Sequence, residues 1–155
     1  METGEENNRL MVCALRSSLI RRIVTNGTTS NVSFTSTTST GGTHGINLTN
    51  VSGTFAFGSG GLTNNTTAGF ALAQNAANSA NVTYGGNINP TAAGRAIDIG
   101  TAVASSGMRG GTIGLSGNIG DTSVNNSGIR VRNSTAGTLN LTGATYATDG
   151  GWTTY

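Results

Sequence analysis

The sequence predicts an all-β fold, a single-stranded parallel β-helix (β-solenoid) with three strands per coil and about five coils. Three observations carry this prediction. Thr, Gly, Asn and Ser supply more than half of the 155 residues, apolar residues alternate along short segments, and those segments recur in a fixed order. The length suits one domain, and the absence of Lys together with a charged fraction of 9% excludes a soluble helical bundle.

The first 24 residues differ from the rest and predict an N-terminal helical cap or a non-native leader, followed by the parallel β-helix over residues 25–155. Thr3 and Glu6 have the spacing of a capping box, and apolar residues from Val12 to Ile23 recur at helical intervals. We therefore expect one short helix over residues 5–24. The chain has no run of ~18 apolar residues, so no membrane span is expected.

Beyond residue 25, the apolar residues come in pairs separated by one residue, which is the pattern of a strand with one buried face. They fall into three series. The first is Ile46/Leu48, Phe70/Leu72, Ile97/Ile99 and Ile129/Val131. The second is Val32/Phe34, Phe55/Phe57, Val82/Tyr84, Ile113/Leu115 and Leu139/Leu141, and the third is Leu62, Ile88, Ile119 and Tyr146.

The three series alternate in constant order, which defines a repeat. Steps in the second series are 23, 27, 31 and 26 residues, and steps in the third are 26, 31 and 27 residues. Both lengthen at the same place, so a loop is expected between Thr101 and Gly110. A unit of this size cannot bury its own apolar side chains, whereas stacked units form a continuous core.

Two sets of residues are expected at the corners of the coils. Glycines follow the strands of the second series, where a side chain would obstruct the turn: Gly58, Gly85, Gly117 and Gly143. Polar residues follow the strands of the first series: Asn50, Gln74, Thr101 and Asn133. We expect their side chains to point inward and to bond to one another and to the backbone.

The segments Gly45–Phe55 and Gly110–Ile119 resemble the right-handed parallel β-helix repeats of secreted bacterial surface proteins, namely autotransporter passengers and filamentous haemagglutinin-like adhesins. The resemblance covers roughly residues 28–146 and is one of composition and period. It implies a non-catalytic, structural or adhesin-like segment at the cell surface or outside the cell. Its partners would be glycans or proteins of a host or neighbouring cell, bound through exposed polar faces.

Several other functions are not expected. Residues 25–94 contain no Asp, Glu, Lys or Arg, which removes the basic track that nucleic-acid binding requires. The single Cys13 excludes an internal disulfide and a thiolate metal cluster. His44 lies among Gly41, Gly42, Thr43 and Gly45 and is expected in an exposed loop rather than at a metal. We expect no enzymatic activity and no catalytic, cofactor-binding or metal-binding residue. Which residues bind a ligand is unknown from the sequence.

One alternative is a fragment of a polysaccharide-active enzyme similar to pectate lyases, whose chemistry needs converging carboxylates. The only carboxylates after residue 25 are Asp98, Asp121 and Asp149. Asp98 and Arg130 occupy equivalent outward positions one coil apart, so we expect a surface ion pair worth ~0.5 kcal/mol. A catalytic Asp98 with Arg130 as its electrostatic partner is the enzymatic interpretation of the same pair.

A second alternative is an ice-binding solenoid, because threonines recur in one outward row. That row is Thr54, Asn81, Thr112 and Thr138, and the next row is Ala56, Thr83, Gly114 and Asn140.

The open edges of the end coils also suggest end-to-end self-association. Trp152 and Tyr155 would either shield such an edge or belong to a further coil.

Overall fold

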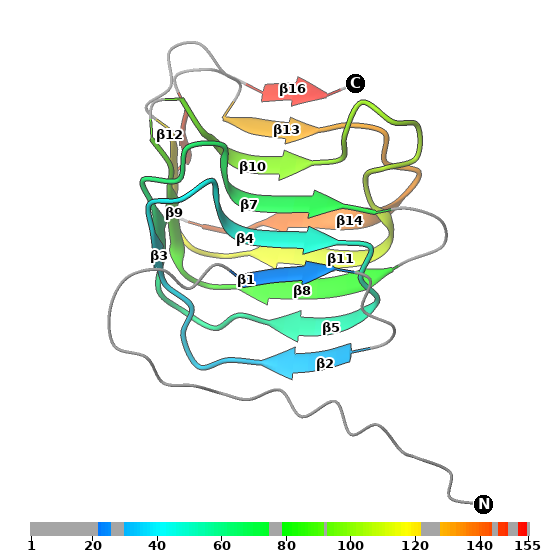
Figure 1. Ribbon diagram of the computed structural model, residues 1–155, viewed down its shortest axis with the longest axis horizontal. Coiled ribbons are helices and arrows are strands. Elements are labelled where there is room, and N and C mark those ends of the chain that lie inside the picture. The colour runs from blue at the N-terminus through cyan, green and yellow to red at the C-terminus, as the bar shows by residue number, and fades with distance from the viewer. Residues whose placement is uncertain are drawn as a thin grey trace, which may run out of the picture.

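A computed structural model describes residues 22–25, 30–74, 79–91, 93–121, 128–143, 146–148 and 152–154. Within these ranges the protein is an all-β parallel solenoid with three sheets, and no helix is present. About four coils have described side chains, and further strands extend the sheets at both ends. The prediction of a parallel β-helix with three strands per coil is confirmed (Figure 1).

Successive strands pass through the three sheets in turn. The first sheet contains β1 (Arg22–Thr25), β4 (His44–Thr49), β7 (Ala68–Ala73), β10 (Arg95–Ile99), β13 (Ile129–Val131) and β16 (Trp152–Thr154). The second contains β2 (Ser30–Ser33), β5 (Gly53–Ala56), β8 (Ala80–Tyr84), β11 (Arg109–Leu115) and β14 (Ala136–Leu141). The third contains β3 (Ser39–Thr40), β6 (Gly61–Thr63), β9 (Asn87–Asn89), β12 (Ile119–Asp121) and β15 (Tyr146–Thr148).

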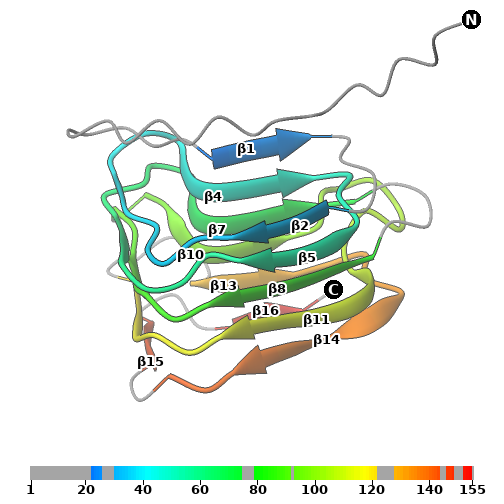
Figure 2. The ribbon, with the colours of Figure 1, turned by 90° about the horizontal axis from the view of Figure 1, so that it is seen from below.

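Each predicted series of apolar residues forms one sheet in the predicted register. In the first sheet Ile46 pairs with Phe70, and Phe70 pairs with Ile97. In the second, each strand of the series pairs in parallel with the next, and in the third Leu62 pairs with Ile88. Figures 1 and 2 show the strands of the first and second sheets running in opposite directions around the coil.

The core is a set of apolar stacks inside the coils. Phe55 and Val82 are fully buried and Ile113 is 1% exposed, while Leu139 packs against them at the end of the same stack. The rings of Phe34 and Phe57 are stacked with centroids 6.0 Å apart. Burial of large apolar side chains stabilises such a core by roughly 1.5–3 kcal/mol each.

The N-terminal prediction is wrong where it can be compared. Residues 22–25 form β1, which pairs in parallel with β4 over four residues. The predicted helix over residues 5–24 therefore does not extend to its proposed end, and the solenoid includes residues assigned to the cap. Ile23 and Val24 are β-branched residues, which suit a strand, and pairing with a neighbouring strand decides against the helical spacing. The rest of that helix, like Cys13 and Tyr155, lies outside the described residues.

The glycine corner is confirmed at three of its four predicted positions. A β-carbon on Gly58, Gly117 or Gly143 would lie within 2.1 Å of a backbone oxygen of the preceding coil. Gly85 has room for a β-carbon, with its nearest atoms at 3.5 Å, so that part of the prediction is wrong. The crowded residue is Gly86, whose β-carbon would meet Gly60 O at 2.5 Å and the Tyr84 hydroxyl at 2.3 Å.

The polar corner bonds mainly to backbone groups rather than forming a ladder of side chains. Gln74 is buried, accepts a bond from Val51 N–H and donates to Val51 C=O, both at 2.9 Å. Asn133 donates to Thr101 C=O at 2.7 Å. These bonds satisfy main-chain groups where the first sheet ends and the chain turns.

The expected loop follows β10 and contains the extra residues of the longest repeat. Its base is fixed by Ser106, whose hydroxyl accepts from Thr101 N–H at 2.7 Å. Gln74 N–H donates to Ser106 C=O at 2.8 Å, which attaches the loop to the preceding coil. Val103 is 69% exposed at the tip.

Candidate functional site

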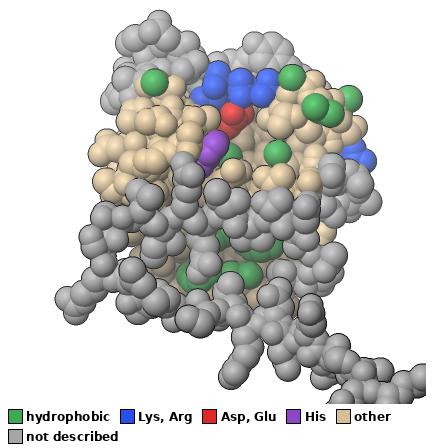
Figure 3. Space-filling view, viewed as in Figure 1, with side chains coloured by type: hydrophobic (Ala, Val, Ile, Leu, Met, Phe, Trp, Pro, Cys, Tyr) green, Lys and Arg blue, Asp and Glu red, His purple; other side chains and the backbone are tan. Residues whose placement is uncertain are grey.

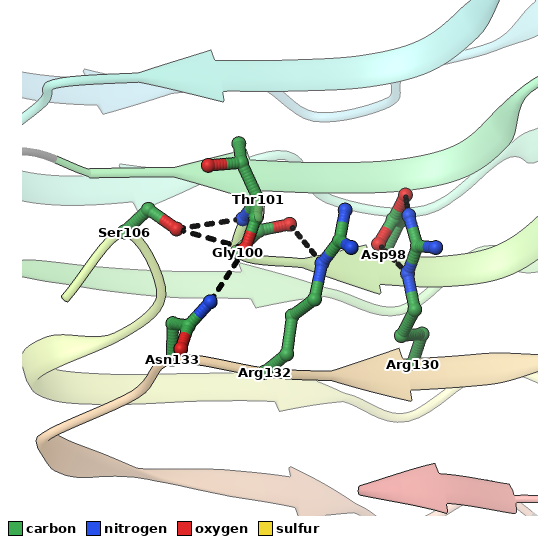
Figure 4. A network of polar contacts seen from close by, with 7 residues as sticks. All are labelled: Asp98, Gly100, Thr101, Ser106, Arg130, Arg132 and Asn133. Carbon is green, nitrogen blue, oxygen red and sulfur yellow. Dashed lines mark hydrogen bonds and ion pairs between the residues drawn. The ribbon is translucent and has the colours of Figure 1, made fainter. Parts of the chain in front are cut away.

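The outer face of the first sheet carries the predicted pair of charged residues. Asp98 on β10 and Arg130 on β13 are register partners. Arg130 Nε donates to Asp98 Oδ1 at 2.8 Å, and Arg130 Nη2 donates to Asp98 Oδ2 at 2.6 Å (Figure 4). The predicted ion pair is confirmed, and its bidentate geometry engages both carboxylate oxygens.

The environment of this pair differs from the prediction. The side chains of Arg130 and Asp98 are only 19% and 14% exposed, so the pair is largely desolvated rather than a surface pair. Removing one partner of a largely buried ion pair lowers stability more than removing one partner of an exposed pair, because the remaining charge stays buried and uncompensated. The estimate of ~0.5 kcal/mol for exposed pairs is therefore too low for the loss of either side chain.

Arg132 directly follows β13 and lies beside this pair on the same face of the first sheet, as Figure 4 shows. Its Nε donates to Gly100 C=O at 3.3 Å, and it forms no ion pair within the part of the chain that the structure describes. Figure 3 shows basic, acidic and histidine side chains together on this face of the molecule. Arg132 was not singled out from the sequence, although its spacing of two residues from Arg130 indicates the same face.

His44 is the first residue of β4 and is half-buried, so its predicted place in an exposed loop is wrong. Its backbone pairs with Ala68 of β7. Among the described residues, no group of three or more His, Cys, Asp or Glu side chains could hold a metal ion. The same ranges contain no helix long and apolar enough to cross a membrane.

The outer face of the second sheet is polar and uncharged over most of its area. The predicted rows are confirmed by the register, in which Thr54 pairs with Asn81 and Thr112 with Thr138. Thr112 N–H also donates to the Asn81 side-chain oxygen at 3.0 Å. All four side chains in this row are exposed.

An open groove of about 450 Å³ runs along the end of this face, where its strands turn toward the third sheet. It is lined by Phe34, Ala56, Gly58, Thr83, Tyr84, Gly85, Gly114, Ser116, Asn140 and Thr142. These residues come from five successive coils, so the groove is about 19 Å long at the usual strand spacing of ~4.8 Å. Its axis follows the solenoid rather than the strands.

Two glycines keep the groove open without being required by the backbone. A β-carbon on Gly114 would meet nothing closer than 3.8 Å, and one on Gly85 nothing closer than 3.5 Å. Neither is among the glycines with left-handed φ. Thr83, Ser116, Asn140 and Thr142 are exposed around them and present hydroxyl and amide groups.

The sequence prediction named no binding residue, and the groove was missed. Four of its lining residues, Ala56, Thr83, Gly114 and Asn140, form the second outward row predicted from the sequence. That row was considered only for ice binding, which it suits poorly. The signal that could have revealed it is a glycine inside a strand, a position that weakens the strand and often marks a close approach by a ligand or another backbone.

Comparisons with known proteins give no relative. No family model, no curated protein and no solved structure matches this chain. The fold is therefore established by its own geometry, and the function must be argued from the exposed faces.

Proposed function

We propose that the protein is a non-catalytic, adhesin-like β-solenoid segment of a bacterial cell-surface or secreted protein, and that it binds glycans in the groove on the second sheet. The repeat resembles those of surface adhesins, and the groove offers a ligand-sized, uncharged surface. Proteins of a neighbouring cell are the other partner class for these polar faces.

The chemistry of the groove suits a neutral glycan. Sugar hydroxyls both donate and accept hydrogen bonds, as do the Thr83, Ser116 and Thr142 hydroxyls, and the Asn140 amide supplies both functions as well. These groups lie on adjacent coils about 4.8 Å apart, so a chain laid along the groove meets a new set at each coil. Many such contacts, each weak, add up along an extended ligand.

Gly114 is the observation that carries the proposal. It sits inside β11, where Gly is less stable than Ala by roughly 0.5–1 kcal/mol. The space for a β-carbon is free, so packing within the fold gives no reason for its absence. An open groove floor gives such a reason, because a side chain there would stand between Thr83 and Asn140.

The test is glycan-array binding of the purified chain, followed by titration of the strongest neutral glycan into two variants. Gly114→Val fills the groove floor, whereas Thr112→Val places the same side chain on the same face of β11 outside the groove. We expect Gly114→Val to weaken binding at least tenfold and Thr112→Val to leave it within twofold. Equal affinities for the two variants, or no glycan binding by the parent chain, contradict the proposal.

A polysaccharide-cleavage screen on the same samples tests the enzymatic alternative. Asp98 has both oxygens bound by Arg130 and lies on the first sheet, away from the groove. Cleavage of any bound glycan would favour a polysaccharide-active enzyme over a non-catalytic segment.

The ice-binding alternative is supported by one exposed row, Thr54, Asn81, Thr112 and Thr138. The adjacent row holds Ala56 and Gly114, so a second matching rank of hydroxyls is missing there. A thermal-hysteresis measurement decides this alternative, and unaltered ice growth would exclude it.

A further inference from the structure

We infer that the outer face of the first sheet carries a second binding site, in which the Arg132 guanidinium receives the carboxylate of an acidic polysaccharide. This site lies on a different sheet from the groove and does not depend on it. The inference rests on the distribution of charge, on the partners of each charged group, and on the shape of the sheet beside Arg132.

Within the part of the chain that the structure describes, the charged side chains are concentrated in the later coils. Arg95, Arg109, Arg130 and Arg132 are the basic residues whose side chains the structure describes, and Asp98 is the acidic one. The earlier coils contribute no charged Lys, Arg, Asp or Glu between residues 25 and 94. Figure 3 shows basic side chains gathered at the top of the first-sheet face, next to an acidic side chain and the histidine.

Arg130 of β13 and Arg132, which directly follows this strand, are in different electrostatic states. Arg130 is neutralised by Asp98 through two charged hydrogen bonds. Within the described ranges the Arg132 side chain makes one hydrogen bond, from Nε to the neutral Gly100 carbonyl at 3.3 Å, and no ion pair with a carboxylate. Its terminal nitrogens therefore keep donors in the planar fork that matches a carboxylate.

The sheet beside Arg132 leaves this fork accessible. Arg132 begins a row of outward positions that crosses the first sheet from one coil to the next. The row continues with Gly100, then Ala73, then Thr49 of β4. Gly100 presents no side chain, so the guanidinium lies over the backbone just after β10, beside the Asp98 pair (Figure 4). The more distant positions, Thr49 and Asn47, are neutral and can bond to sugar hydroxyls.

The ligand class follows from these groups. On this face, one arginine without an ion pair among the described residues is too little for nucleic acid, which requires a track of cations along its phosphates. It is enough for one carboxylate, with the remaining sugar units lying on polar, uncharged sheet. A polyuronate has this composition, because it repeats a carboxylate on a neutral, hydroxyl-rich backbone.

The experiment measures binding of the full chain to alginate, a polyuronate, and to the same alginate after reduction of its carboxylates to alcohols. We expect the reduced polymer to bind at least tenfold more weakly, and alginate binding to weaken as salt is raised. Equal affinity for the two polymers, or no alginate binding, overturns the inference.

Two charge-matched variants locate the site. Arg132→Gln and Arg109→Gln each remove one positive charge, but Arg109 is on β11 of the second sheet. We expect Arg132→Gln to weaken alginate binding about tenfold and Arg109→Gln to change it less than twofold. Equal losses would mean diffuse attraction by net charge and would overturn the assignment.

Two further variants test whether a loss of alginate binding comes from the Arg132 site itself. One controls for a loss of stability and the other for binding in the groove. Arg132→Lys keeps the charge but loses the fork, so it should bind with intermediate affinity while unfolding at the same temperature as the parent. Gly114→Val, which fills the groove, should bind alginate like the parent. Loss of alginate binding in Gly114→Val would place the polyuronate in the groove and refute a separate site.

Discussion

Two glycines three residues apart offer a sharp test of how the coils stack. Gly117 lies at the corner after β11, and a β-carbon there would be 2.0 Å from Gly86 O and 2.4 Å from Gly86 C. Gly114 lies inside β11, and its β-carbon would have 3.8 Å of clearance. The change from Gly to Ala is chemically identical at both positions, so any difference between the variants reports on the packing of neighbouring coils.

The expected magnitudes follow from these distances. At Gly117 the neighbouring backbone must retreat by about 1 Å to reach the 3.0 Å that real β-carbons respect, and no flexible side chain can absorb this shift. Forced backbone shifts of this kind cost roughly 1–3 kcal/mol, and the gain from replacing Gly offsets only part of that. We expect a net loss of about 2 kcal/mol for Gly117→Ala and a gain of about 0.5 kcal/mol for Gly114→Ala.

The assay is urea and thermal unfolding followed by far-ultraviolet circular dichroism. For a chain of this size, 1 kcal/mol corresponds to roughly 2–4 °C in Tm. Gly117→Ala should therefore unfold about 4–8 °C below the parent and Gly114→Ala about 1–2 °C above it. If the two variants had the same stability, or if Gly114→Ala were the less stable, the proposed contact between successive coils would be refuted.

Three further substitutions test the polar contacts. Asp98→Ala should lower the free energy of unfolding by about 2 kcal/mol, since it leaves Arg130 largely buried without its partner, and the double variant with Arg130→Ala should lose less than the sum of the single changes. Additive losses in urea unfolding would show that the two residues do not interact. Gln74→Ala should lower the free energy of unfolding by about 2 kcal/mol, because the buried N–H and C=O of Val51 lose their hydrogen-bond partners. A loss below 0.5 kcal/mol, as at ordinary surface positions, would argue against those two bonds. Burial raises the pKa of Tyr84, so the folded state disfavours the phenolate that the unfolded chain forms above pH ~10, and stability must fall as the pH rises through that value. Tyr84→Phe should remove this alkaline loss, at a cost of about 1 kcal/mol near neutral pH from the lost bond to Thr37 C=O, and an unchanged pH profile would contradict it.

The sheet register was predictable because each coil has one buried face and because three series must stay in phase. A shift of one residue would turn a whole apolar pair outward, so Phe55, Val82 and Ile113 fix their strands relative to one another. The same reasoning located Asp98 opposite Arg130, since the residue between two buried neighbours must face outward. The strand at residues 22–25 was missed because a short apolar pattern fits both helical and strand spacing until a pairing partner is known.

The features that position the candidate sites depend on distances that a repeat pattern does not contain. Gly85 and Gly86 are adjacent in the sequence, yet only Gly86 is crowded by a neighbouring coil. The groove arises where turns of five coils align, and the low exposure of the Asp98 pair depends on its surroundings rather than on its place in the repeat. Composition and period predict which residues face outward, but not which outward positions are hollow or shielded.

Disulfide trapping between neighbouring strands tests the stacked solenoid most directly. With Cys13 replaced by Ser, the pair Thr54→Cys and Asn81→Cys occupies register partners on adjacent strands, about 4.8 Å apart, within the range that a disulfide spans. The pair Thr54→Cys and Thr112→Cys lies two strands apart, at roughly twice that spacing, and is out of reach. The solenoid predicts rapid and complete oxidation of the first pair and none of the second within the same molecule. Failure of the adjacent pair to oxidise, or equal oxidation of both pairs, would contradict the stacking order on which the groove and the arginine site depend.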